Sequence, residues 1–568
     1  MEYVMQSKFV KLIFINCCII IIGISTNSNY ILNAQTGGGY FSGNAQLEAQ
    51  TYKEDSAMGA KSVNEQILSN GFFNLNYVND GLSAGIRYEY YLNPLLGIDQ
   101  RYKGQGLAYR FVNYSSNILD FTAGNFYEQF GSGIIFRAYE EKALGVDNAI
   151  DGIRLKVRPV NGIEVSGIYG TQRYYWTQGR GIVRGGDINF LLNDIVNQGD
   201  NIAGMNITAG ANFISTYQSD ISTEFFNPEN VLAWSSRIGL QSENFAVDGE
   251  FAYKYNNPNA TNSNSTFRNY NPGYGLILNG SYFEKGISAS INLHKIDNMD
   301  FRSDRNASGT DLILNYIPPL TKQHSYRLAT MYPFATKYNG EAGLQVDFDY
   351  SIPKNSMLGG KYGTDIALNF SRVQSIDTTH IDEFTYNSPF FGIGNDLFFQ
   401  DININIQKKY SSNLKTSVSF FNVIYDRDQI EKEGGSHFGK VHLNILVADA
   451  IYRLTDNYAL KLEVQHQWYK QDSATSPEDL INGNWIGILA ELTISPGWYF
   501  TIFDDWNYGN AVSERKIHYF NGNIAYTVGS TRFSFGYGRH MAGILCIGGV
   551  CRQVPASNGF NLSVSTSF

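Results

Sequence analysis

Few residues of this chain could carry chemistry by their type and spacing. Its 568 residues include eight histidines, and none has a second histidine at the spacing of helical metal ligands. Asp297, Asp300 and Asp304 could together hold calcium, but the EF-hand spacing is missing, so we interpret them as a solvated loop. We therefore expect no metal, no cofactor and no enzymatic activity, although a Ser-His-Asp site could still assemble in space.

Histidines and cysteines instead fit structural positions. His466 alternates in phase with Leu462, Val464 and Trp468, which predicts a place in an interfacial aromatic belt, while His294 and His540 lie on polar faces. Beyond the first 34 residues the chain has two cysteines, Cys546 and Cys551. In an exported protein such a pair predicts a disulfide that closes a short loop.

Charged residues at alternate positions suggest a polar interior. In 151–158, Arg154, Lys156 and Arg158 alternate with apolar residues. A cation that faces lipid at the bilayer midplane costs roughly 2–4 kcal/mol, so these three must point inward if the strand crosses a membrane. Inward carboxylates by the same pattern include Glu164, Asp347 and Asp349. These six residues are our candidates for lining a lumen.

The elements that would position these residues are strands. Period-2 alternation dominates from residue 40 onward, as in 82–90, 287–293 and 344–350, and each run is about ten residues long, enough for a tilted strand to cross a bilayer. Tight turns such as 79–81, 161–162 and 529–530 alternate with long polar loops such as 255–272, 373–395 and 470–484. This predicts an all-β fold, a large antiparallel transmembrane β-barrel of about 26 strands (24–26), with short periplasmic turns and long extracellular loops. The pair between residues 182 and 212 is the least certain.

Both ends of the chain agree with this architecture. Residues 1–34 contain Lys8 and Lys11, an apolar run and a small residue, Ala34, before Gln35, which predicts a cleaved signal peptide followed by a barrel over 35–568. At the other end Phe560, Leu562, Val564 and Phe568 share one face. An apolar last strand that ends on an aromatic resembles the C-terminal signal by which outer-membrane barrels are recognised for insertion.

Composition excludes several other classes of protein. Aromatic residues make up 14% of the chain and charged residues 17%, whereas a soluble protein has about 25% charged residues. The aromatic content excludes a disordered chain. A net charge of −9 argues against nucleic acid as a partner.

One segment interrupts the alternation. Residues 125–150 contain aromatic and aliphatic side chains that a solvated loop would not carry, among them Phe130, Ile134 and Phe136. We expect this segment to fold back into the lumen, with contact to a partner or ligand and an extra strand as alternatives.

Two glycine-rich stretches carry a resemblance to a known family. The segment Gly124–Gly133 and the corner Leu358-Gly359-Gly360-Lys361-Tyr362-Gly363-Thr364 resemble an uncharacterised family of outer-membrane barrels from Bacteroidota, defined only by a domain of unknown function. The resemblance covers nearly the whole mature chain, with Gly124–Gly133 as its most distinctive part. It implies an outer-membrane location and brings no activity and no catalytic residues.

These observations favour a channel or transporter for solutes across the outer membrane. The alternatives are a non-conducting structural or accessory subunit of an envelope secretion or surface-assembly complex, and an adhesin-like surface protein. The expected partners are outer-membrane lipid, the barrel-insertion machinery and an envelope protein.

Overall fold

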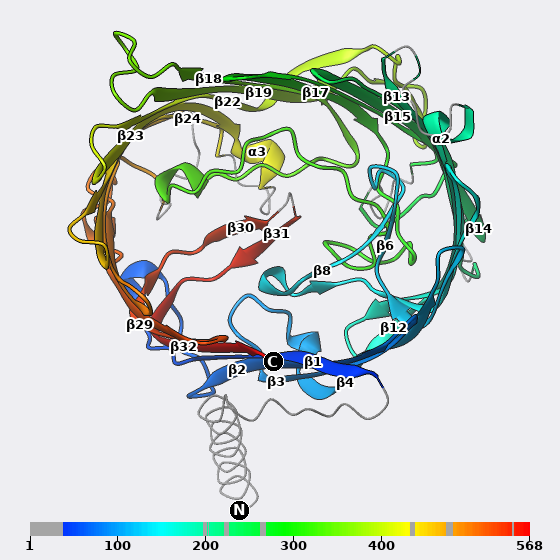
Figure 1. Cartoon of the computed structure of the whole chain (residues 1–568), viewed down its shortest axis with the longest axis horizontal. Helices are drawn as coiled ribbons and strands as arrows, with labels where there is room; N and C mark the ends of the chain where they lie inside the picture. Colours follow the sequence, from blue (N-terminus) through cyan, green and yellow to red (C-terminus); the bar gives the residue numbers. More distant parts are fainter. Residues whose placement is uncertain are drawn as a thin grey trace, which may run out of the picture.

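A single closed sheet organises the chain. The computed structural model describes residues 38–196, 202, 204–220, 226–261, 269–431, 438–472, 481–547 and 550–568, so the predicted signal peptide, residues 1–34, lies outside the described residues. Within them, 24 strands form one antiparallel barrel, seen from one end in Figure 1. Neighbours in sequence pair with each other around the wall, and β1 closes the ring by pairing with both β2 and β32.

The wall strands are mostly 10–15 residues long, as the alternation predicts. In chain order they are β1 (Tyr40–Gln50), β2 (Leu68–Asn79), β3 (Leu82–Asn93), β4 (Gly104–Ser115), β5 (Leu119–Phe126), β10 (Ile150–Val160), β11 (Ile163–Tyr174), β12 (Thr177–Leu191), β13 (Asn206–Tyr217), β14 (Asn230–Gln241), β15 (Phe245–Lys254), β16 (Gly273–Glu284), β17 (Ile287–Asp297), β18 (Gly340–Ile352), β19 (Thr364–Ile376), β22 (Ile393–Lys409), β23 (Leu414–Asp426), β24 (Lys440–Arg453), β25 (Tyr458–Gln471), β26 (Trp485–Ile494), β27 (Trp498–Trp506), β28 (Asn521–Val528), β29 (Thr531–His540) and β32 (Ser557–Ser567).

The predicted large barrel is confirmed, and its 24 strands lie at the lower end of the expected range. The doubtful region 182–212 contains parts of two wall strands, β12 and β13, which pair directly with each other. Between them lies the short helix α2 (Leu192–Val196). Residues 197–201 and 203 lie outside the described part of the chain.

The two ends of the barrel differ as the sequence predicts. At one end, which we call the short-turn end, wall strands are joined by tight connections such as 80–81, 161–162, 285–286 and 529–530. At the other, the long-loop end, connections include 51–67, 127–149, 298–339 and 541–556. Exceptions are few: 192–205 and 353–363 are longer connections at the short-turn end, and 175–176 is a tight one at the long-loop end.

Smaller elements lie within the connections. The short strands are β6 (Glu128–Phe130), β7 (Phe136–Ala138), β8 (Glu140–Glu141), β9 (Val146–Asp147), β20 (Thr379–His380), β21 (Tyr386–Asn387), β30 (Gly543–Ile547) and β31 (Val550–Val554). The helical turns are η1 (Ser56–Met58), η2 (Gln100–Tyr102), η3 (Lys142–Leu144), η4 (Leu328–Thr330), α3 (Arg427–Ile430) and η5 (Ser513–Arg515). Among the described residues, no helix is both long and apolar enough to cross a membrane.

The two faces of the wall carry different residues. On β10, Ile153 is 49% exposed and Leu155 is 42% exposed on the outer face, while the intervening Arg154 makes ion pairs inside the barrel. An apolar outer face that alternates with a polar inner face is the pattern of a barrel built for a bilayer. His466 also lies on this outer face, where its ring packs 4.2 Å from that of Trp468.

Apolar side chains from two long connections fill part of the interior. The first connection is 127–149, which Figure 1 shows inside the ring of strands as β6 and β8. The second is 298–339, which contributes buried Phe301, Leu314 and Leu328. The sequence analysis singled out the first segment and not the second.

Burial of the second connection corrects one prediction. Asp297, Asn298 and Asp300 are 2%, 0% and 5% exposed, so the interpretation of this stretch as a solvated loop is wrong. The charge of Asp300 is matched by Arg302, whose Nε lies 2.7 Å from the carboxylate. A buried carboxylate with a local cation is stable where an isolated one is not.

Candidate functional site in the lumen

A chain segment that projects inward builds the candidate site. After β5 ends at Phe126, the backbone turns through Gly131 and Gly133, whose φ values of 55° and 95° lie in the left-handed region that favours glycine. A side chain at Gly131 would also meet the carboxylate of Glu250 at 2.5 Å. Glu250 accepts a hydrogen bond from the backbone N–H of Ser132 at 2.7 Å, so the turn is held against strand β15.

The two inward connections hold each other in place. The backbone N–H of Arg137 donates to the carbonyl of Leu314 at 2.7 Å, and the N–H of Tyr316 donates to the carbonyl of Gly133 at 2.9 Å. Phe130, Ile134 and Phe136 are at most 1% exposed within the same apolar cluster. The two connections therefore pack against each other.

A network of buried charges fastens this segment to the barrel wall. Arg87 on β3 lies 2.6 Å from Glu89 on the same strand and 2.8 Å from Glu140 on β8, and it also pairs with Asp147 on β9. Arg173 on β11 lies 2.8 Å from Glu89 and 2.5 Å from Asp147. Two wall strands and the inward segment therefore meet in one set of ion pairs.

Tyr127 adds hydrogen bonds to the same network. Its hydroxyl accepts from Arg87 at 3.2 Å and donates to Asp147 at 3.1 Å. Burial raises the pKa of Tyr127 well above that of a free tyrosine, so the phenol stays protonated and can donate. Burial likewise raises the pKa of Glu140, against the opposing effect of Arg87.

The network is electrically balanced and deeply buried. The side chains of Arg87, Glu89, Asp147 and Arg173 are 2–7% exposed. Lys142 also approaches Glu140, with Nζ 3.8 Å from the carboxylate. The cluster thus contains three cations and three carboxylates: Arg87, Lys142, Arg173, Glu89, Glu140 and Asp147.

The three carboxylates lie close enough together to suggest a metal site. Ligand oxygens of Glu89, Glu140 and Asp147 fall within 4.8 Å of one another. Each carboxylate already faces a guanidinium, however: Arg87 pairs with all of them and Arg173 with two. Because a cation would have to displace the guanidinium groups, the arrangement fits an ion-pair lock better than a metal centre.

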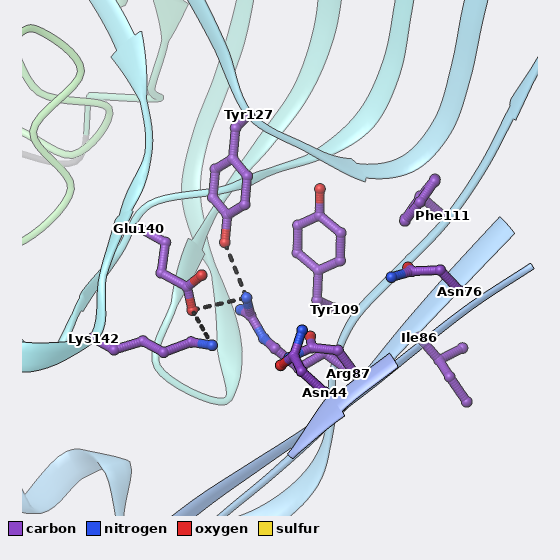
Figure 2. Close-up of a pocket in the computed structure, with 10 residues that line it drawn as sticks. Asn44, Asn76, Ile86, Arg87, Tyr109, Phe111, Tyr127, Glu140 and Lys142 are labelled. Atoms are coloured by element: carbon purple, nitrogen blue, oxygen red, sulfur yellow. Dashed lines mark hydrogen bonds and ion pairs between the residues drawn. The ribbon is translucent and has the colours of Figure 1, made fainter. Parts of the chain in front are cut away.

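A cavity of about 290 Å³ lies on one side of the network (Figure 2). Arg87, Glu140 and Lys142 form its charged wall, and the rest of the lining is polar or aromatic apart from one aliphatic residue, Ile86: Asn44, Asn74, Asn76, Tyr109, Phe111 and Tyr127. Asn74 pairs in register with Arg87 at the middle of β2, and Asn76 lies nearer than either to the 80–81 turn. The cavity therefore faces the short-turn end.

A second and much smaller cavity, of about 30 Å³, lies on the other side. Tyr174 and Tyr175 line it at the 175–176 turn of the long-loop end, together with Asp311 of the second inward connection. Asp147 and Arg173 line it too. Asp147 pairs with Arg87 of the larger cavity, and Arg173 joins the same network through Asp147. The ion-pair network is therefore a partition between the two spaces.

The predicted lumen-lining residues fall into separate groups. Lys156 and Arg154 lie 2.7 Å and 3.4 Å from Glu128 on β6, so they help to hold the inward segment. Arg158 and Glu164 pair with each other at 2.8 Å beside the 161–162 turn. The structure brings none of these four into the partition.

Asp347 and Asp349 lie elsewhere, on β18. Asn369 donates to Asp347 at 2.7 Å, and Ser288 donates to Asp349 at 3.0 Å. His294, on the neighbouring β17, is 5% exposed, with Nε2 2.6 Å from Glu341. These polar groups bind neighbouring wall residues.

The sequence analysis missed the partition as a unit. Its signals were present but local: Arg87 and Glu89 are two positions apart on the inner face of one strand, and the inward segment contains Glu140 and Asp147. Arg173 gave no signal, because its role depends on which strands the closed wall places near each other.

The predicted disulfide and terminal strand can also be located. Cys546 and Cys551 are bonded to each other across the β30–β31 hairpin, which lies inside the ring of strands in Figure 1. Phe560 and Phe568 are about half exposed, at 49% and 48%, and Val564 is covered at 7%. Leu562 lies between Phe560 and Val564 on β32 and pairs in register with Ala49 of β1.

One stretch matches the spacing of a hydrolase nucleophile motif. Gly81-Leu82-Ser83-Ala84-Gly85 has the Gly-x-Ser-x-Gly pattern. Ser83 lies in β3, directly after a two-residue hairpin turn. The hydrolase motif instead requires a sharp turn from a strand into a helix. The match is therefore a feature of the hairpin.

The chain has a low similarity to several solved structures of receptors and transporters. The siderophore receptor PirA from Pseudomonas aeruginosa matches with 10% identity and a TM-score of 0.40, covering 93% of this chain and 80% of that one. The ferric enterobactin receptor PfeA from the same organism, in complex with enterobactin, matches with 10% identity and a TM-score of 0.43 over 94% and 82%. The copper transporter OprC gives 11% and 0.38 over 94% and 81%. With TM-scores below 0.5, these similarities carry no weight for the ligand or mechanism of this chain.

Family membership rests on the sequence itself. No curated protein matches the chain. A family model, described as a family of unknown function (DUF6029), matches residues 5–568. Since that match spans nearly the whole sequence, the protein belongs to the DUF6029 family.

Proposed function

We propose that this protein is an outer-membrane barrel that conducts small solutes and that its inward 127–149 segment restricts the passage. The observation that carries the proposal is the buried ion-pair partition, which joins that segment to the wall between two cavities that face opposite ends of the barrel. A scaffold barrel would need to be filled, but it would not need a balanced set of charges between a 290 Å³ cavity and a second space of about 30 Å³, the size of one water molecule.

The membrane location is part of the same proposal. Large apolar side chains on the outer face, such as Ile153, Val165 and Ile502, are 42–55% exposed. Around a closed wall these residues form far more exposed apolar surface than a soluble monomer carries, and lipid would cover it. We place the short turns and both termini in the periplasm, with the leader cleaved after Ala34 and lipid and the insertion machinery as partners. A Bacteroidota origin and an envelope protein partner also belong to this proposal.

The deciding experiment is single-channel conductance of the purified barrel in a planar bilayer. Wild type is compared with a variant in which residues 128–148 are replaced by a short Gly-Ser linker. We expect small or intermittent conductance from wild type and large, steady conductance from the variant. An absence of conductance from both wild type and variant, with each barrel shown to be folded by its heat-dependent gel mobility, would contradict conduction and favour a structural subunit.

A further inference from the structure

The 290 Å³ cavity contains polar atoms that the described protein leaves available. Asn76, labelled in Figure 2, makes no side-chain hydrogen bond to any residue that the structure describes, and the same holds for the Tyr109 hydroxyl. Asn74 donates to Asn44 at 2.8 Å. That bond uses the amide N–H₂ of Asn74 and the carbonyl of Asn44, so the N–H₂ of Asn44 and the carbonyl of Asn74 make no side-chain hydrogen bond to the residues that the structure describes.

These groups offer donors and acceptors in a mixed array. A side-chain amide supplies two N–H donors and a carbonyl acceptor, and a phenol supplies one O–H group that both donates and accepts. The natural complement is a ligand whose groups also do both, which is the property of an alcohol hydroxyl. A carboxylate or phosphate ligand would satisfy only the donors.

The charged wall of the cavity disfavours an ion. Arg87 has three carboxylate partners, and Lys142 lies 3.8 Å from Glu140 with its ammonium 4.6 Å from the Phe72 ring. An anion would have to compete with Glu140 for both cations, and a cation would have to compete with both cations for Glu140. An uncharged solute leaves the balance intact.

The remaining wall is aromatic. Tyr109 and Phe111 come from alternate positions of β4 and meet edge to face, with ring centroids 6.0 Å apart. Such rings provide an apolar surface for the C–H groups of a ligand. A volume of 290 Å³ lies just below the range of about 300–1,000 Å³ that holds drug-sized ligands, so the solute is small.

From these walls we infer that the cavity binds a small, uncharged, hydroxyl-rich solute of monosaccharide size. The inference rests on the proposed conduction and names the class of solute. Asn44, Asn74, Asn76 and Tyr109 hydrogen-bond its hydroxyls, Phe111 packs against its C–H face, and the partition stops it from diffusing onward until the inward segment moves.

The test is binding of D-glucose to the purified full-length barrel in detergent, followed by saturation-transfer NMR. D-Gluconate and D-glucosamine serve as anionic and cationic analogues of similar size. We expect glucose to bind and both charged analogues to bind at least tenfold more weakly. Asn76→Leu should weaken glucose binding about tenfold, which is the effect of roughly one hydrogen bond.

The matched control is Asn523→Leu. Asn523 is an inner-face asparagine on β28 that bonds to Ser534 at 2.9 Å and does not line this cavity, so its substitution should leave glucose binding unchanged. Heat-dependent gel mobility establishes that both variants are folded. Equal binding of charged analogues, or unchanged glucose binding in folded Asn76→Leu, would overturn the inference.

A transport measurement separates this inference from the proposal beneath it. Liposomes that contain the barrel are tested for swelling in glucose. Swelling without detectable binding would contradict the proposed binding site and leave the proposed conduction standing. Binding without swelling, together with no conductance in the planar bilayer, would contradict the proposed conduction and leave the binding site standing.

Discussion

Arg173 and Glu89 form an ion pair across the inside of the barrel, with Nη2 2.8 Å from Oε2 and side chains 5% and 2% exposed. Along the wall, β3 and β11 are separated by β4, β5 and β10. A contact between strands that are four places apart is a chord through the lumen. In this sector the lumen is therefore closed by side chains of the wall itself, with Asp147 of the inward segment held between them.

Breaking that chord should release the inward segment. Arg173→Ala leaves the carboxylates of Glu89 and Asp147 buried with one cation fewer, and removal of one partner from a buried pair costs about 3–5 kcal/mol. We expect a lower free energy of unfolding in urea from lipid vesicles, and a larger single-channel conductance than wild type.

The control for this substitution is Arg158→Ala. Arg158 and Glu164 are 42% and 30% exposed, and exposed pairs contribute only about 0–1 kcal/mol. Equal effects of the two substitutions would show that Arg173 has no special role in closing the lumen.

Acidification should favour the docked segment, because burial raises the pKa of Glu140 above its ordinary value of 4.5. The docked state then binds a proton more tightly than the undocked state does. Docking is strongest below about pH 4.5, where the carboxyl is protonated in both states, and weakens as the pH rises through the raised pKa. The groups that face Glu140 are Arg87, Lys142, Asp147 and Glu89.

Conductance recorded between pH 7.5 and pH 5 tests this sign. We expect it to decrease as the pH falls in wild type, and we expect Glu140→Gln to resemble the acidic state at every pH. An increase on acidification, or an unchanged pH profile in Glu140→Gln, would contradict the assignment to Glu140.

The chain terminus should control insertion. Phe568 exchanges two backbone hydrogen bonds with Gly43, at 2.9 Å and 3.0 Å, and its ring stacks on Phe73 with centroids 6.2 Å apart. Because β32 pairs with β1 to close the sheet, Phe568→Ala removes an aromatic contact at the seam. We expect severalfold less heat-modifiable barrel in outer-membrane fractions. Ser567→Ala, one residue earlier, is the control and should insert normally.

The orientation can be read by labelling single cysteines on intact cells with a membrane-impermeant maleimide. Asn387→Cys lies in the 377–392 connection of the long-loop end, and Asp456→Cys lies in the 454–457 turn of the short-turn end. Both positions are exposed, and the bonded Cys546 and Cys551 do not react. We expect label only at position 387. Label only at position 456 would show that the short-turn end faces the cell exterior, opposite to our assignment.

The sequence by itself determined the wall of this protein. Alternation along 82–90 or 344–350 assigns each side chain to a face, and the cost of a lipid-facing cation decides which face is inner for Arg154 and Lys156. Turn residues at 79–81 and 161–162 define the hairpins. These are local properties, since each depends on neighbours in the chain, and the strand period of two applies without knowledge of the rest of the fold.

Only the tertiary structure decided what the lumen contains. The alternation-free stretch with Asp297, Asp300 and Asp304 was interpreted as a solvated loop, yet Asp297 and Asp300 are buried because the closed wall surrounds them, and Asp300 pairs with Arg302. Likewise, Arg87, Asp147 and Arg173 come from three regions of the chain. Their meeting depends on the curvature of 24 paired strands and on the path of a segment that crosses the interior. Neither the curvature nor the path of the segment produces a periodic pattern in the sequence, because the ion-pair network depends on a few individual residues that are far apart in the chain.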